Sequence, residues 1–196
     1  MANARTFTPV DEYLQGERET EIRHEYVNGT VHPMGGASRN HNLIAGNLFA
    51  ALHAALRGGP CQTFMADMKV HLRLGDDELF YYPDVMVGCD PNDRHRHYLE
   101  RPRVIAEVAS PATERVDRRE KLLAYTRLDS LATYLIVEQQ CPAVPVYRRN
   151  AGWAAEYLGT EDRLELPELE WSLPVEELYT GVDPDAVTEE PAPPCR

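Results

Sequence analysis

Two acidic residues stand out because each lies in an apolar segment that reads as a buried strand. Asp84 follows Pro83 at the start of the run 82–88, and Glu107 lies inside the run 104–108. A buried carboxylate without a partner is costly, and two on neighbouring strands repel unless a proton or a cation lies between them. Mg²⁺ suits such ligands, because it takes one or two carboxylates together with water and phosphate oxygens. Capping of a loop or pairing with a nearby arginine is the alternative.

A cationic group follows on the next predicted helix, over residues 113–128, with Thr113 as its N-cap. Asp117, Lys121 and Tyr125 recur every four residues and therefore share one face of that helix. This face could point at the end of the sheet where Glu107 emerges. The alternative is a solvated Asp–Lys pair, which contributes little free energy.

The remaining elements indicate a mixed α/β fold with a central sheet and helices packed against it. The strand–helix–strand order over residues 104–137 predicts a crossover beside antiparallel hairpins. Asn28-Gly29 predicts a tight hairpin turn near the N-terminus. The other expected elements are a helix starting with Thr8 as N-cap, a helix over 40–57, strands over 68–74 and 133–138, and a strand pair over 144–149 and 153–158.

The composition is that of one soluble globular domain. The chain has 196 residues, of which 43% are apolar and 27% charged, which excludes a fibre, a disordered chain and a disulfide-rich miniprotein. Residues 1–181 are expected to form the domain. Residues 182–196 are acidic and rich in proline, and we expect them to be disordered.

The formal net charge of −12 argues against a protein that coats nucleic acid without specificity. Residues 94–121 run against this trend, with eight basic and five acidic residues and a net charge of +3. An enzyme that guides a phosphate into one cleft needs such a local excess. A mixed, solvated helix surface would give the same count.

The four cysteines lie far apart and form no CxxC pair, so reduced thiols and an intracellular location are favoured. The N-terminal segment has no apolar run typical of a secretory signal. The sequence has no stretch of about 18 apolar residues, so no membrane-spanning helix is predicted. We therefore expect a cytoplasmic protein.

Taken in order, these motifs resemble the Uma-two family of restriction-endonuclease-like proteins in the PD-(D/E)XK nuclease superfamily. The resemblance runs over about residues 6–178. Each motif is weak alone, and the ordered set is much more specific. Its parts are His24-Glu25-Tyr26-Val27-Asn28-Gly29, His41, Pro83-Asp84-Val85, Glu107-Val108-Ala109-Ser110-Pro111, Asp117 with Lys121 and Tyr125, and Thr133-Tyr134-Leu135-Ile136-Val137.

The resemblance implies a restriction-endonuclease-like core with N-terminal hairpin additions, and it implies roles for site residues. Asp84, Glu107 and Val108 would bind Mg²⁺ or Mn²⁺. The superfamily usually has a lysine two residues after the second acid, where this chain has Ala109, and Lys121 on the following helix would replace it. Glu25 and His41 match further family positions and complete the candidate catalytic set.

The implied function is a metal-dependent endonuclease that hydrolyses phosphodiester bonds in DNA. A metal would lower the pKa of a bound water, and Lys121 would stabilise charge on the phosphate or orient the attacking water. A homodimer is expected by analogy with the superfamily. The alternative is an inactive nuclease-fold module that binds DNA or protein in a regulatory role, which Ala109 and the net charge of −12 favour.

Overall fold

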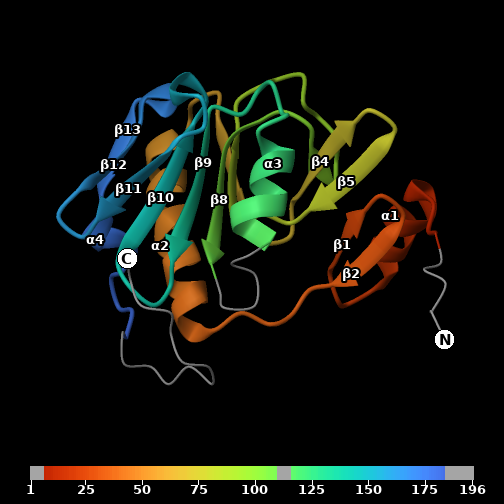
Figure 1. Ribbon diagram of the computed structural model, residues 1–196, viewed down its shortest axis with the longest axis horizontal. Coiled ribbons are helices and arrows are strands. Elements are labelled where there is room, and N and C mark those ends of the chain that lie inside the picture. The colour runs from red at the N-terminus through yellow and green to blue at the C-terminus, as the bar shows by residue number, and fades with distance from the viewer. Residues whose placement is uncertain (1–6, 110–115, 184–196) are drawn as a thin grey trace.

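The chain folds around a six-stranded central sheet (Figure 1), and the computed structural model describes residues 7–109 and 116–183. The strands of this sheet are β3 (Gln62–Met65), β6 (Val85–Gly88), β8 (Pro102–Ala109), β9 (Thr133–Glu138), β10 (Ala143–Arg148) and β11 (Ala155–Gly159). Their order is β11-β10-β9-β8-β6-β3. The β8–β9 pair is parallel and the other pairs are antiparallel. The predicted crossover over residues 104–137 is therefore confirmed.

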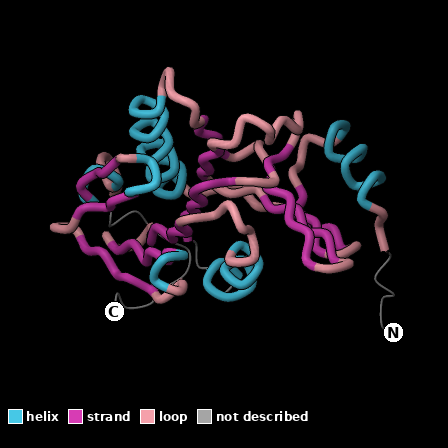
Figure 2. Tube along the Cα trace, turned by 90° about the horizontal axis from the view of Figure 1, so that it is seen from above, coloured by secondary structure: helices cyan, strands magenta, loops and turns pink. Residues whose placement is uncertain are grey.

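The two faces of the central sheet pack against different partners because side chains alternate along each strand. On β8, Val104, Ala106 and Val108 face the core formed with α2 (Arg39–Leu56). Ile105 and Ala109 face the opposite core, which includes residues of α3 (Leu122–Tyr125). Figure 2 shows α2 and α3 on opposite sides of the sheet. Glu107 lies between Ile105 and Ala109 in this alternation and thus shares the face of α3.

A second, five-stranded sheet closes the α3 side of the molecule. Its strands are β1 (His24–Val27), β2 (Thr30–Pro33), β4 (Lys69–Leu74), β5 (Asp77–Tyr81) and β7 (Tyr98–Leu99), in the order β2-β1-β5-β4-β7. Val70, Leu72 and Leu79 of this sheet join the core on the α3 side of the central sheet.

The N-terminal helix α1 (Val10–Glu19) packs on the five-stranded sheet through an aromatic cluster. The Tyr13 ring lies 4.9 Å from that of Tyr26 and 5.5 Å from that of Phe80. Asn28 and Gly29 both have positive φ, 44° and 85°, as the tight turn between β1 and β2 requires. The expected hairpin addition at the N-terminus is therefore confirmed.

The long helix α2 matches the predicted helix over residues 40–57. It buries Ile44, Leu48 and Leu52 on one face, as their spacing indicates. Ser38 is its N-cap, and its hydroxyl accepts the N–H of His41 at 3.0 Å. The cap fixes the start of the helix and hence the position of the His41 side chain in its first turn.

The C-terminal part of the described chain covers α2. It contains the two-stranded sheet of β12 (Arg163–Leu166) and β13 (Trp171–Pro174), followed by α4 (Val175–Leu178). Asn47 of α2 donates from its amide to the carbonyls of Leu178 and Thr180, each at 2.9 Å. The expected disordered tail lies outside the described residues from residue 184 onward.

Two predicted boundaries are wrong. The run 82–88 is a strand only from Val85, because β5 ends at Tyr81 in one sheet and β6 starts at Val85 in the other. Thr8 does not cap α1: Pro9 holds the N-cap position, and the Thr8 N–H donates to the carbonyl of Gly29 at 2.9 Å. The strand pair over 144–158 is confirmed as β10 and β11.

The predicted helix over residues 113–128 is irregular in the described part. It runs as a π-helix, η1 (Val116–Lys121), and then as the single α-turn of α3. Thr113, its expected N-cap, lies outside the described residues. The wider π-turn ends at Lys121 and includes it, and π-turns are often found at functional sites.

The expectation of reduced cysteines is wrong for Cys61 and Cys89, which form a disulfide. β3 pairs antiparallel with β6, with Gln62 opposite Gly88, so the next residue outward on each strand is a cysteine. The pairing of two distant strands creates this contact, and the spacing of the cysteines in the sequence does not reveal it. Cys141 is also disulfide-bonded.

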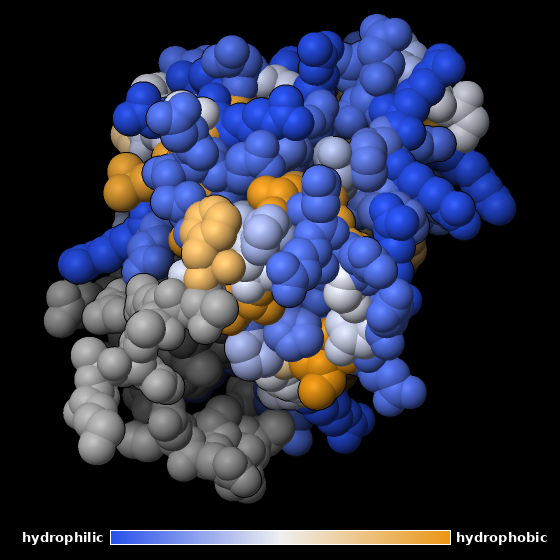
Figure 3. Space-filling model, turned by 90° about the vertical axis from the view of Figure 1, so that its right-hand side faces the viewer, coloured by the Kyte–Doolittle hydropathy of each residue, from blue (hydrophilic) through white to orange (hydrophobic). Residues whose placement is uncertain are grey.

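The surface at the end that carries α1 and the β1–β2 hairpin is mainly hydrophilic, with apolar residues in small separate patches (Figure 3). Across the described residues, five large apolar side chains are exposed: Phe7, Ile22, Met34, Leu123 and Tyr157. No helix in the described ranges is long and apolar enough to cross a membrane.

Candidate active site

Three segments bring the predicted acids and lysine together. Asp84 directly precedes β6, Glu107 is the third-last residue of β8, and Lys121 is the last residue of η1. Val85 is paired with Ala106, so one step further along this antiparallel register Asp84 is level with Glu107. The carboxylates that stood out in two apolar runs are therefore neighbours across the β6–β8 pair.

Glu107 is buried and accepts two charged or polar donors from the following helical segment. Its Oε1 lies 3.2 Å from Lys121 Nζ and 2.9 Å from the Tyr125 hydroxyl, which donates to it. Only 3% of Glu107 and 5% of Lys121 is exposed. The predicted shared face of Lys121 and Tyr125 thus points at Glu107, whereas the side chain of Asp117 lies outside the described part of the structure.

Glu25 enters the same cluster from β1 of the other sheet. Its Oε1 lies 2.9 Å from Lys121 Nζ and accepts no aligned hydrogen bond within the described residues, so the contact is an ion pair. One ammonium group therefore lies against two carboxylates, one from each sheet. This arrangement lowers the cost of burying each charge.

Two tyrosines complete the surroundings of Lys121. Lys121 Nζ lies 5.4 Å from the centre of the Tyr81 ring, a distance that suits a cation–π contact. Burial, and then the negative charge of Glu25, raise the pKa of Tyr81 to about 12. Burial, and then the charge of Glu107, raise the pKa of Tyr125 well above its ordinary value. Both phenols therefore keep their protons near neutral pH, and Tyr125 can donate to Glu107.

Asp84 is held by two groups that reach the same oxygen. The backbone N–H of Val108 donates to Asp84 Oδ2 at 2.7 Å, and His41 Nε2 lies 3.1 Å from that atom. The Asp84 and His41 side chains are 19% and 17% exposed, so this part of the site reaches solvent. His41 comes from the first turn of α2, and Val108 follows Glu107 on β8.

All of the predicted site residues thus fall into two groups joined by β8. One group is Asp84, His41 and Val108, and the other is Glu25, Glu107 and Lys121, with Tyr125 added. Sequence reasoning missed Tyr81. Its signal was weak, because Tyr81 meets Lys121 only when β5 pairs with β1, where Phe80 is opposite Tyr26.

The chemistry of the donor set bears on whether a metal fits. Among the described residues, no group of three or more His, Cys, Asp or Glu side chains is arranged to hold a metal ion. Mg²⁺ needs fewer, because it usually keeps several waters and binds through one or two carboxylates. The donors here are oxygens of Asp84 and Glu107. The carbonyl of Val108 points to the same side of the strand as its N–H, which reaches Asp84. These hard oxygen donors fit Mg²⁺ or Mn²⁺.

Comparison with known families matches nearly the whole of the described chain. The sequence pattern of the Uma2 family, described as "Putative restriction endonuclease", matches residues 10–176. Two uncharacterised proteins of Synechocystis, slr1290 and sll1609, are similar over most of their length. The first is 34% identical over 88% of this chain and 91% of its own. The second is 32% identical over 82% and 90%.

A solved structure has the same fold. It is a crystal structure described as a "putative nuclease" of the DUF820 group from Anabaena variabilis, with a TM-score of 0.70 and 17% identity. The match covers 88% of this chain and 98% of the other. The predicted restriction-endonuclease-like core, a mixed central sheet flanked by helices, is confirmed by this likeness.

Proposed function

This chain belongs to the Uma2 family, and we propose that it is an endonuclease that hydrolyses phosphodiester bonds in DNA with Mg²⁺ or Mn²⁺ as cofactor. The observation that carries the proposal is the convergence of Asp84, Glu107 and Lys121 from three separate segments. Phosphoryl transfer requires negative ligands for a metal and a positive charge near the phosphate. The two carboxylates would bind the metal, and the buried lysine would supply the positive charge.

The metal would be held by Asp84, Glu107 and the carbonyl of Val108. Asp84 is already oriented by the Val108 N–H and by His41, and both contacts use Oδ2. Glu107 is oriented through Oε1 by Lys121 and Tyr125. A bound Mg²⁺ or Mn²⁺ would lower the pKa of a water and polarise a phosphoryl oxygen. Ligands fixed by their neighbours lose little freedom when they bind.

The chain's own residues then have distinct tasks. Lys121 would stabilise the negative charge that grows on the phosphate or orient the attacking water. Glu25 holds Lys121 through an ion pair from β1, and the Tyr125 hydroxyl orients Glu107. His41 fixes the rotamer of Asp84. We assign Glu25, His41 and Tyr125 as positioning residues on these contacts.

A basic surface segment leads into β8, at the opposite end of the β6–β8 pair from Asp84 and Glu107, and would contact a long polyanion such as DNA only outside the site. Arg94, Arg96, Arg101 and Arg103 are all exposed, although Arg101 is paired with Asp90 at 2.8 Å. Arginines placed in this way can neutralise backbone phosphates, which makes DNA binding weaker at high salt. The assembly proposed by analogy is a homodimer.

The function is tested by incubating purified protein with supercoiled plasmid and Mg²⁺, Mn²⁺ or a chelator. We expect nicking by the wild type only when metal is present. Asp84→Asn and Lys121→Ala should each lower the rate by at least about 100-fold, the range found when a transition-state stabiliser is removed. Asp129→Asn, the same change at an exposed position beyond α3, should leave the rate unchanged.

Ala109, at the usual lysine position, favours a second candidate: a nuclease fold that binds DNA or protein and does not cleave. The same assay separates the two. If the wild type is as silent as Asp84→Asn with either metal, while it still retards the plasmid in a gel, the endonuclease proposal is wrong and the binding module is supported.

A further inference from the structure

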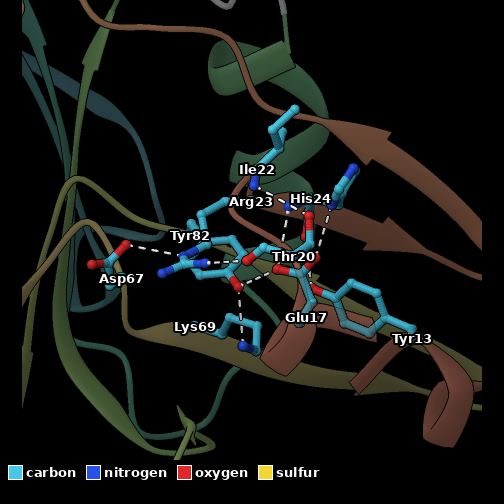
Figure 4. A network of polar contacts seen from close by, with 9 residues as sticks. All are labelled: Tyr13, Glu17, Thr20, Ile22, Arg23, His24, Asp67, Lys69 and Tyr82. Carbon is cyan, nitrogen blue, oxygen red and sulfur yellow. Dashed lines mark hydrogen bonds and ion pairs between the residues drawn. The ribbon is translucent and has the colours of Figure 1, made fainter. Parts of the chain in front are cut away.

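The chain contains only two lysines, and both are buried. Lys121 belongs to the candidate active site. Lys69, 6% exposed, belongs to a second polar cluster on the other side of β1 (Figure 4). We call it the Glu17 cluster and define it by these residues: Tyr13, Glu17, His24, Lys69 and Tyr82.

The carboxylate of Glu17 is the centre of this cluster. Its side chain is 3% exposed and accepts the Tyr82 hydroxyl at 2.5 Å and the backbone N–H of His24 at 3.3 Å. Its other oxygen lies 2.9 Å from Nδ1 of the His24 ring. Lys69 Nζ donates to the Tyr82 hydroxyl at 3.0 Å. Charge-assisted hydrogen bonds of this kind are stronger than those between neutral groups.

The Glu17 cluster lies at the start of β1 and bonds to the backbone of His24 there. Tyr26 and Phe80 are paired between β1 and β5, and two steps further the register would set His24 opposite Tyr82. At that point the chain leaves β5 and crosses to β6 of the central sheet. The backbone N–H of His24 therefore bonds to Glu17, and its carbonyl accepts the Tyr13 hydroxyl at 2.7 Å. Two side chains of α1 replace the missing strand.

Glu25 follows His24 directly, and its side chain points to the opposite face of β1. There it contacts Lys121 at 2.9 Å. The backbone pairing of β1 with β5 covers only Tyr26 and Val27, and the other side-chain tie next to His24 is the ion pair of Arg23 with Asp67, whose side chain is 76% exposed. An exposed pair contributes little, so the buried Glu17 cluster is the stronger attachment.

We propose that Glu17 is a positioning residue for the active site: by joining α1, β1 and Tyr82, it docks the N-terminal hairpin and holds Glu25 against Lys121. The part of this inference that concerns catalysis rests on the proposed function. The part that concerns the position of Glu25 does not, and the experiment separates the two.

The test uses the fact that the only lysine amines of the chain are those of Lys69 and Lys121. Labelling with an acylating reagent at constant pH, read by mass spectrometry, follows each amine separately. In Glu17→Gln and in Tyr82→Phe we expect Lys121 to be labelled at least about tenfold faster than in the wild type. The free energy lost with a hydrogen bond to a charged group is large enough to make local opening more frequent by that factor.

Three further variants make the result specific. Asp67→Asn has the same carboxylate-to-amide change at the exposed tie, and it should leave the labelling of Lys121 unchanged. Glu25→Gln sets the rate expected when the ion pair itself is weakened. The double variant Glu17→Gln/Glu25→Gln should be no faster than Glu25→Gln alone, because both changes break the same contact.

Two outcomes would overturn the proposal. The first is an unchanged rate at Lys121 with faster labelling of Lys69, because the cluster would then act only on its own surroundings. The second is that backbone hydrogen exchange in Glu17→Gln speeds up as much in β9 and β10 as in β1, because Glu17 would then support the whole fold. A wild type that fails to nick plasmid while the labelling results hold would refute the endonuclease and leave the docking role of Glu17 intact.

Discussion

At the residue scale, the site depends on how one ammonium group is surrounded. Lys121 contacts Glu25 and Glu107 and lies over the ring of Tyr81. Burial of such a group is favourable only when its charge is compensated on several sides. Burial, and then repulsion between a phenolate and these carboxylates, raise the pKa values of the neighbouring phenols Tyr81 and Tyr125.

The raised pKa of Tyr81 gives a prediction for alkaline pH. An unfolded tyrosine loses its proton near pH 10, whereas burial raises the pKa of Tyr81 to about 12. Between these two values the folded state holds more protons than the unfolded state. The contribution of Tyr81 to stability is therefore complete below pH 10 and is lost as pH rises toward 12. Between pH 9 and 11 we expect the wild type to lose about 1 kcal/mol more unfolding free energy than Tyr81→Phe.

Urea unfolding of the two proteins at both pH values measures this difference. The other buried tyrosines, whose pKa values are also raised, contribute equally to both proteins and cancel. An equal loss in wild type and Tyr81→Phe would mean that Tyr81 titrates normally and does not feel the burial that the structure shows.

At the residue scale, sequence reasoning found the two acids and the helix face with Lys121 and Tyr125 that contacts Glu107. Asp84 and Glu107 were visible because a charge inside an apolar run needs a reason. The ion pair of Glu25 with Lys121 joins segments that lie far apart in the chain. The helix-face spacing indicated Lys121, whereas only the family resemblance suggested Glu25. Glu17 and Tyr82 gave no signal, since an acid on an amphipathic helix usually faces solvent.

At the scale of elements, the site lies where the chain crosses from the five-stranded sheet to the central sheet. β5 ends at Tyr81 in one sheet and β6 begins at Val85 in the other, and Asp84 lies in the link. The apolar pattern of residues 82–88 predicted a single strand, because hydrophobicity shows burial and does not show which sheet a segment joins. By contrast, Asn28-Gly29 predicted its hairpin correctly, since a tight turn is specified locally.

The disulfide gives a prediction at this scale. Cys61 and Cys89 are 28 residues apart and join the outer ends of β3 and β6. Closing a loop of this length restricts the unfolded chain, which corresponds to about 3–4 kcal/mol of stability. We expect the double variant Cys61→Ser/Cys89→Ser to unfold at correspondingly lower urea concentration.

Urea unfolding of the oxidised wild type, the reduced wild type and the double variant makes the comparison. Because reduction also breaks the disulfide of Cys141, the reduced protein should unfold at or below the urea concentration that unfolds the double variant. If all three unfold at the same urea concentration, the bond between β3 and β6 does not stabilise the edge strand of the central sheet.

At the scale of the whole molecule, both sheets and α2 contribute residues to one cluster of charges. The central sheet supplies Glu107, the five-stranded sheet supplies Glu25, and α2 supplies His41. The crossover between β8 and β9, which the sequence order of elements predicted, places Lys121 above them. A metal bound at this point would favour the folded state of the entire chain, because a ligand that binds only the folded protein raises its stability.

The divalent-metal site proposed at Asp84 and Glu107 is tested by titrating Mn²⁺ and counting bound ions by electron paramagnetic resonance. We expect one saturable site in the wild type and in Asp129→Asn, with a higher thermal unfolding temperature when the site is filled. Asp84→Asn and Glu107→Gln should bind at least about tenfold more weakly and show a smaller rise, because each removes a charged ligand. Equal binding by the wild type and both site variants, or no saturable binding by the wild type, would mean that Asp84 and Glu107 do not form a metal site.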